Sequence, residues 1–221
     1  MLHRHIVALR TDAPGAEDLA ATRERLRDAF PRNATRRMTQ LGLLLGGVLH
    51  DLAPTENDTV VYASVYGETR ALEDYLTSFP TPSPTLFQTS IHPSGIQQVL
   101  IARQQPIRHF FPHTGQRHLV AQAVQSALLS PTPRTLLCGG EERGTWLLEH
   151  DAASGDTFAF ALALSSDSAN ALGSLRLEQT TAAESALEAE LRLPRFFSAL
   201  VQREPLSHPV APGLILTLSW N

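Results

Sequence analysis

The sequence contains no lysine, so all 18 of its basic residues are arginines. This absence excludes every mechanism that needs a Schiff-base lysine or a lysine as general base. Set against 22 acidic residues, the arginines leave a net charge of −4. Such a balance gives no reason to expect nucleic acid or an anionic membrane as the main partner.

Cysteine is almost absent as well. Cys138 is the single cysteine in 221 residues, which excludes a disulfide framework within the chain. It ends an apolar segment and does not stand at the start of a helix. We therefore interpret Cys138 as a buried structural thiol and not as a nucleophile.

Long apolar runs are also lacking. The first ten residues do not contain the apolar run of a signal peptide. The longest apolar stretch, 41–49, contains three glycines and is too short to cross a bilayer. We expect a cytoplasmic protein with no membrane span.

What the sequence does contain is an alternation of strand and helix patterns. Residues 59–65 are apolar and rich in β-branched side chains, as in a strand covered on both faces, whereas 116–129 has the periodicity of an amphipathic helix. The patterns predict a mixed α/β protein with a layered sheet. Strands are expected at 6–9, 59–65, 134–138, 146–150, 157–164, 175–178 and 214–220. Helices are expected at 16–30, 36–52 (with Thr35 as N-cap), 68–78, 95–103, 116–129, 180–191 and 194–201. An extended loop is expected at 80–84 and irregular structure at 106–115.

Three segments together carry a family resemblance. Residues 36–41 (RRMTQL) open a helix, 60–68 (VVYASVYGE) form a strand and turn, and 83–92 (SPTLFQTSIH) precede the next helix. In this order and spacing they resemble short β-ketoacyl-synthase-like proteins of aryl polyene and xanthomonadin-type pigment pathways. The pattern Ser-Pro-Thr-x-Phe-x-x-Ser-Val-His-Asn-Ala is typical of those proteins. The resemblance spans about residues 35–150. Pro93-Ser94 stands in place of Asn-Ala, so no polar role of that Asn carries over.

The resemblance implies a thiolase-like fold, roughly half of a ketosynthase or a truncated one, with a mixed sheet flanked by helices. It implies one ketosynthase-like domain over residues 1–221, in which 165–221 form a C-terminal covering segment. It further implies a heterodimer with a full-length ketosynthase, as formed by chain-length factors of type II polyketide systems. An acyl carrier protein would be met through that complex, and no cofactor is implied.

A ketosynthase needs a thiolate at a helix N-terminus, where the helix dipole lowers the thiol pKa and N–H groups stabilise an oxyanion. By the resemblance this position falls within Thr85–Gly95, which contains no cysteine. His92 lies at or next to it. We therefore expect no catalytic residue and a pseudo-active-site region of Phe87, Ser90, His92 and Gly95. His92 either lines a tunnel toward the partner's site or hydrogen-bonds its loop. Gly42, Gly46, Phe110 and Phe111 are candidates for an acyl tunnel or a subunit interface, with ordinary core packing as the alternative.

The leading hypothesis is thus a non-catalytic, chain-length-factor-type subunit. The alternative is a stand-alone acyltransferase or thioester hydrolase of the same pathway that uses Ser90 or Cys138 with a histidine. No Gly-x-Ser-x-Gly elbow surrounds Ser90. A structural or binding module without a pathway link is a third reading.

Two further clusters are weaker. His109, His113 and His118 have no carboxylate or cysteine nearby in the sequence, so no metal site is expected. Arg36-Arg37 is interpreted as a solvated helix start, with a phosphopantetheine or carrier-protein contact as the alternative.

Overall fold

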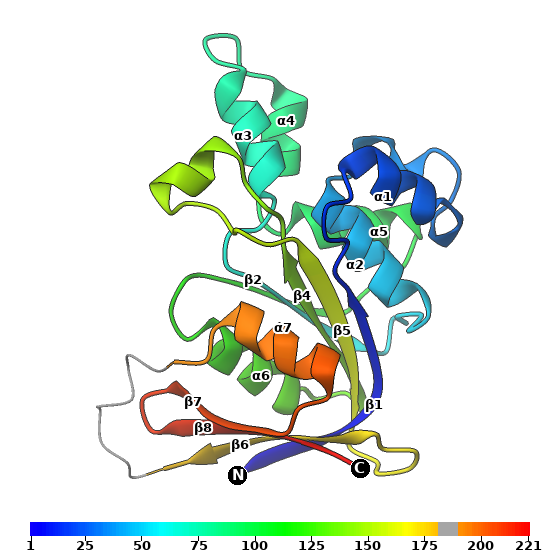
Figure 1. The fold of residues 1–221 in the computed structure, drawn as a ribbon. Coiled ribbons are helices and arrows are strands. Elements are labelled where there is room, and N and C mark those ends of the chain that lie inside the picture. Colours follow the sequence, from blue (N-terminus) through cyan, green and yellow to red (C-terminus); the bar gives the residue numbers. More distant parts are fainter. Residues whose placement is uncertain (181–189) are drawn as a thin grey trace.

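Eight strands form one mixed sheet in the computed structural model, which describes residues 1–180 and 190–221 (Figure 1). The strand order is β3-β2-β4-β5-β1-β6-β8-β7. Strand β2 runs parallel to both of its neighbours, and all the other pairs are antiparallel. The expected mixed α/β architecture is therefore confirmed. The strands are β1 (Leu2–Asp12), β2 (Thr59–Ser64), β3 (His109–Thr114), β4 (Arg134–Glu141), β5 (Phe158–Ser165), β6 (Gly173–Gln179), β7 (Leu206–Ala211) and β8 (Leu214–Trp220).

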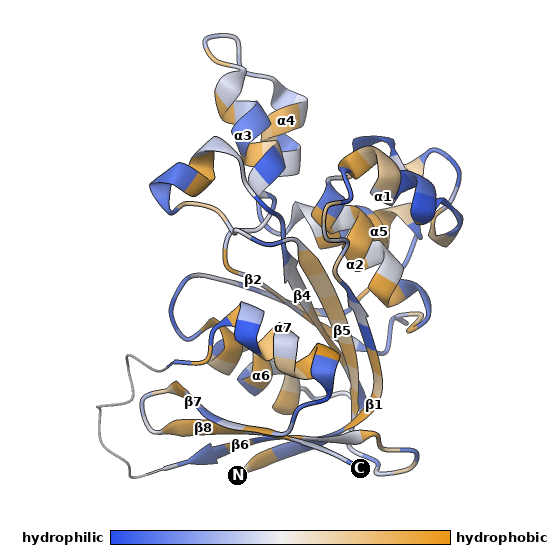
Figure 2. Cartoon of the chain, viewed as in Figure 1, coloured by the Kyte–Doolittle hydropathy of each residue, from blue (hydrophilic) through white to orange (hydrophobic). Residues whose placement is uncertain are grey.

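Helices cover both faces of this sheet. Strand β2 alternates between the two cores, with Val61 and Ala63 facing one and Val60 and Tyr62 the other. The first core includes residues of α6 and α7, and the second includes α2 and α5. Figure 2 shows the apolar residues gathered on the central strands and on the helix faces beside them. The helices are α1 (Leu19–Arg25), α2 (Gln40–His50), α3 (Thr69–Thr77), α4 (Pro84–Ser90), α5 (Ser94–Ala102), α6 (Leu119–Leu128) and α7 (Leu193–Gln202), with 3₁₀ helices η1 (Arg27–Ala29), η2 (Ala34–Arg37) and η3 (Trp146–His150).

The C-terminal elements share a core with the centre of the sheet. Phe196 of α7 packs edge-on against Phe160 of β5, and Phe197 stacks on Phe158 with ring centroids 4.3 Å apart. Strands β6, β8 and β7 prolong the sheet beyond β1 and curve beneath α6 and α7 (Figure 1). Helix α7 therefore packs on one face of the sheet, whereas the last three strands extend the sheet.

Both edges of the sheet differ from expectation. Residues 106–115 were expected to be irregular, but His109–Thr114 forms β3, and β7 was not expected at all. Each of these strands contains a proline, Pro112 in β3 and Pro209 in β7. Proline cannot donate to a sheet ladder, and it is tolerated here because an edge strand needs partners on one side only.

Two local expectations were also wrong, and one helix was not expected. Residues 146–150 form η3 and not a strand, because Glu73 accepts the N–H groups of Thr145 and Leu147 and holds the segment against α3. Helix α2 begins later than expected, and its N-cap is Thr39, whose hydroxyl accepts from Gly42 N at 3.1 Å. The loop expected at 80–84 is observed over 80–83, and α4, which Ser83 caps, follows it as a helix that was not expected.

The remaining helices and strands agree with the expected ones to within a few residues, except that the helix expected at 16–30 is divided into α1 and η1. The helix expected at 180–191 falls mainly on 181–189, outside the described residues. Among the described helices, none combines the length and apolarity that a bilayer crossing requires.

Candidate pseudo-active site

The start of α5 lies beside the end of β2. Strand β2 leads into a turn at Gly67, which has φ +66° and thus the left-handed conformation that glycine adopts without strain. A Cβ at Gly67 would lie 3.2 Å from His92 Nδ1, so glycine also permits the close approach of His92. The turn therefore brings Tyr62, Glu68, His92 and Gly95 together from three segments of the chain.

The ring of His92 stacks on Tyr62, with centroids 5.0 Å apart and planes 17° from parallel. Both ring nitrogens are buried, and neither has a hydrogen-bond partner within the described part of the chain. Burial lowers the pKa of His92 to about 4, with a further contribution from His113. His92 is therefore a neutral imidazole near pH 7.

Glu68 occupies the N-terminus of α5. Its Oε1 accepts the backbone N–H of Gly95 at 2.6 Å, and the side chain is buried. Burial raises the pKa of Glu68 to about 7, against the opposing effect of that hydrogen bond. In an acyl-transfer site, helix-start N–H groups stabilise a developing oxyanion. Here the Glu68 carboxyl group accepts the hydrogen bond of the Gly95 N–H.

Two more buried glutamates support the neighbouring turns. Glu141, at the end of β4, accepts from Val65 N at 2.5 Å and from Tyr66 N at 3.3 Å. Glu142 accepts from Gln40 N at 2.9 Å and Arg70 N at 3.2 Å, so it joins the starts of α2 and α3. Burial raises the pKa of each to about 7.

Sequence reasoning missed these glutamates. The signal was present, since two adjacent acids, Glu141 and Glu142, stand where the apolar strand β4 ends. Buried carboxyl groups need hydrogen-bond donors, and the N–H groups of turns and helix starts supply them here.

The expected site residues divide between two places. His92 and Gly95 lie at the α5 start, whereas Phe87 is half-exposed on α4 and contacts the ring of Tyr75. The hydroxyl of Ser90 donates to Phe87 O at 2.8 Å, so it is engaged within its own helix. The structure thus separates Phe87 from His92 by placing it between α3 and α4.

Cys138 is fully buried in β4, where its thiol donates to Val61 O at 3.5 Å. Burial raises the pKa of this thiol well above its ordinary value. A thiol that stays protonated inside a sheet is a poor nucleophile. The observed geometry therefore does not favour a hydrolase that uses Ser90 or Cys138.

The two expected tunnel glycines lie on α2 in different surroundings. Gly42 faces the start of α5, where an added Cβ would lie 3.6 Å from Gly95 O. Gly46 faces the ring of Phe30, which fills the adjoining space. On β3, Phe110 packs against the second core, whereas Phe111 is 41% exposed. Gly46 therefore allows close packing, whereas Phe111 belongs to an accessible surface.

The three histidines of 109–118 have separate surroundings. His113 Nε2 lies 2.9 Å from Ser126 Oγ, and the His118 N–H donates to Glu190. Across the residues that the structure describes, no three His, Cys, Asp or Glu side chains gather as a metal site would require.

Comparison with solved structures identifies the fold. One chain of the ketosynthase in complex with its chain length factor from Xenorhabdus doucetiae aligns with 99% of this chain and 100% of its own length, at 19% identity and a TM-score of 0.69. The chain has the thiolase-like fold of ketosynthases. This ketosynthase fold confirms, at the level of architecture, the resemblance seen in the sequence.

Other ketosynthase-fold structures agree. The ishigamide ketosynthase/chain length factor matches 82% of this chain and 68% of its own, at 13% identity and a TM-score of 0.58. A type II ketosynthase complexed with its acyl-carrier protein matches 81% of this chain and 70% of its own, at 9% identity and a TM-score of 0.53. No protein-family model and no curated protein matches the sequence.

Proposed function

We propose that this protein is a non-catalytic, chain-length-factor-type subunit that pairs with an active ketosynthase in type II polyketide biosynthesis of the aryl polyene class. The observation that carries the proposal is the hydrogen bond from Gly95 N to the Glu68 carboxyl group at the start of α5. In this proposal the bond occupies the helix start at which a ketosynthase would stabilise an oxyanion. The single thiol, Cys138, lies within the sheet.

Condensation through a thioester needs a nucleophile that can become a thiolate at this helix start. The side chain of the neighbouring His92 is an imidazole and contains no thiol. The hydroxyl of Ser94 donates a hydrogen bond to Thr89 O at 2.5 Å. A carboxyl group beside a developing oxyanion would repel it whenever the carboxyl group is ionised. These features support a role for this chain beside a catalyst, and not as the catalyst.

An accessible sheet edge supports pairing. Within the described residues, β3 pairs with β2 alone, so its outer backbone groups remain available to a partner strand. Phe111 adds an exposed aromatic side chain to this strand. Exposed apolar surface beside an unpaired edge is typical of a subunit interface. We therefore assign β3 to the contact with the ketosynthase.

In this proposal the heterodimer is cytoplasmic, meets the acyl carrier protein through its ketosynthase, and builds a tunnel that measures the growing polyene. His92 lies near the shared site and takes no part in acyl transfer. The assignment of this protein to a pigment pathway is based on the sequence resemblance. The ketosynthase–chain length factor complexes that share the fold support the pairing.

The test is an elongation assay with a pathway ketosynthase, its carrier protein and a malonyl donor, with and without this chain. We expect long polyene products only when both proteins are present and no turnover by this chain alone. Equal activity of the ketosynthase without this chain would overturn the proposal. Turnover of acyl-carrier substrates by the isolated chain, abolished by Ser90→Ala or Cys138→Ala, would support the hydrolase or acyltransferase alternative instead.

A further inference from the structure

A groove of about 580 Å³ opens between the beginnings of α1 and α2 and the α3–α4 pair. Five arginines line it: Arg23, Arg36, Arg37, Arg70 and Arg143. They come from four separate parts of the chain, which the fold brings to one place. This concentration contrasts with the net charge of −4 for the whole protein.

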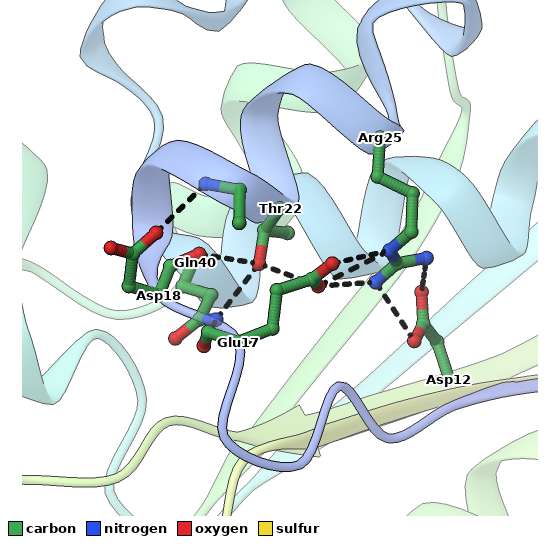
Figure 3. A network of polar contacts seen from close by, with 7 residues as sticks. Asp12, Glu17, Asp18, Thr22, Arg25 and Gln40 are labelled. Atoms are coloured by element: carbon green, nitrogen blue, oxygen red, sulfur yellow. Dashed lines mark hydrogen bonds and ion pairs between the residues drawn. The ribbon is translucent and has the colours of Figure 1, made fainter.

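Acidic side chains of the same lining are largely engaged elsewhere. Arg25 lies between Glu17 and Asp12 (Figure 3). Its guanidinium nitrogens are 2.9 Å from a carboxylate oxygen of each. Asp18 caps α1 by accepting from Ala21 N at 2.8 Å. The charge of Glu17 is thus balanced by an arginine that does not line the groove.

The innermost acid is Glu142, whose two oxygens accept N–H groups at the starts of α2 and α3. Its raised pKa also reduces the negative charge that it presents near neutral pH. Asp74 is the remaining carboxylate of the lining. The acids therefore offset only part of the positive charge around the groove.

Three of the arginines have guanidinium groups available for a ligand. Arg36, Arg37 and Arg143 are exposed, and none forms an ion pair with a described residue. By contrast, Arg70 lies 3.5 Å from Glu73 and Arg23 donates to Thr35 O at 3.3 Å. The available guanidinium groups flank the groove from η2 and from the loop after β4.

We propose that this groove binds a phosphate-bearing small molecule. Guanidinium groups are planar forks that bind phosphate oxygens in pairs, and several of them suit a group with more than one negative charge. The volume lies within the range of small-molecule pockets, about 300–1,000 Å³. The inference goes beyond the proposed function, since it requires no ketosynthase partner and no acyl transfer.

Calorimetric titration with pyrophosphate, in chloride buffer of matched ionic strength, tests the proposal on the full chain. We expect saturable binding that weakens about ten-fold or more in the Arg36→Gln/Arg37→Gln double variant and in Arg143→Gln. Arg108→Gln is the matched control, because Arg108 is exposed and pairs with Glu56 outside this groove. Its affinity should equal that of the wild type.

Titrations with ADP and with 4′-phosphopantetheine distinguish two sources of the phosphate, a nucleotide and a pantetheine arm. Tighter binding of either one identifies the source and supports the site. Absence of saturable binding for all three probes, or an equal loss in Arg108→Gln, would overturn the proposal. Unfolding midpoints of the variants, measured in parallel, verify that each remains folded. Failure here is distinct from failure of the proposed function, which the elongation assay measures separately.

Discussion

Glu68 Oε1 lies 2.6 Å from the backbone nitrogen of Gly95, so a buried carboxyl group caps the start of α5. The contact joins the turn after β2 to the helix that would carry the nucleophile of a ketosynthase. Burial makes this arrangement costly when Glu68 is ionised, and the pKa of about 7 reflects that cost. The same contact therefore links a functional hypothesis to a measurable pH dependence of stability.

The first prediction concerns Glu68→Gln. The folded state holds the Glu68 proton up to about pH 7, whereas the unfolded state releases it near pH 4.5. Between these values the folded state binds more protons, so the wild type loses stability as the pH rises, by at most roughly 3 kcal/mol from this group. Urea unfolding gives the free energy of unfolding at pH 5.5 and at pH 8. From the lower to the higher pH, the variant should gain stability relative to the wild type.

Other groups titrate in the same window, which is why the wild type and the variant must be compared at each pH. The lowered pKa of His92 has the opposite effect on stability. Below about pH 6.5 the unfolded state takes up a proton at His92 more readily than the folded state does, which favours unfolding. Glu24→Gln, at an exposed position, is the control. An unchanged stability difference between wild type and Glu68→Gln at the two pH values would contradict the assignment.

The second prediction concerns His92→Ala. Because His92 stacks on Tyr62 without a hydrogen bond among the described residues, its removal should leave pairing with the ketosynthase intact. In the elongation assay we expect an altered distribution of product lengths. His50→Ala, at the exposed end of α2, should give the wild-type distribution. If the products of His92→Ala also match the wild type, the proposed role of His92 is wrong.

Pairing through β3 leads to the third prediction. Phe111→Arg places a charge on the exposed edge strand and should weaken binding of the ketosynthase by about 2 kcal/mol, or roughly thirty-fold. The unfolding midpoint of the free chain should change little, because Phe111 is 41% exposed. Val201→Arg, at a half-exposed position of α7, provides the control. Equal affinity of both variants would exclude β3 from the interface.

The fourth prediction tests Cys138. With its thiol fully buried and its pKa raised by burial, native protein should resist a thiol reagent, and unfolded protein should react with one equivalent. Cys138→Ala should cost about 1–2 kcal/mol of stability through lost packing. The product distribution of the complex should not change. Rapid labelling of the native chain would contradict the buried assignment.

Two glycines of α2 supply the fifth prediction. An alanine Cβ at Gly46 would lie 2.1 Å from Phe30 Cζ, so Gly46→Ala should destabilise the protein by about 1–3 kcal/mol. At Gly42 the nearest atoms are 3.5 Å away, an ordinary contact. Gly42→Ala should therefore gain up to about 1 kcal/mol from helix propensity. Denaturant unfolding measures how each substitution changes the free energy of unfolding. Equal changes in the two variants would contradict this prediction.

Local pattern determined much of the architecture. The apolar, β-branched run of β2 and the amphipathic period of α6 predicted those elements because their burial follows directly from side-chain spacing. Motif order predicted the ketosynthase fold, and the lack of a cysteine within Thr85–Gly95 predicted a site without a thiolate. These are properties of neighbouring residues, which the sequence records directly.

The sheet edges and the groups at the α5 start depend on contacts between distant parts of the chain. Proline disfavours strands in general, yet pairing with β2 and β8 places Pro112 and Pro209 in edge strands. Glu68 reaches Gly95 across 27 positions, and the groove arginines converge from segments over 100 positions apart. Contacts between distant residues depend on how elements pack, and no local period encodes them. Residue spacing therefore predicted most of the elements and the lack of a thiol within Thr85–Gly95, whereas packing decided which groups meet at the start of α5.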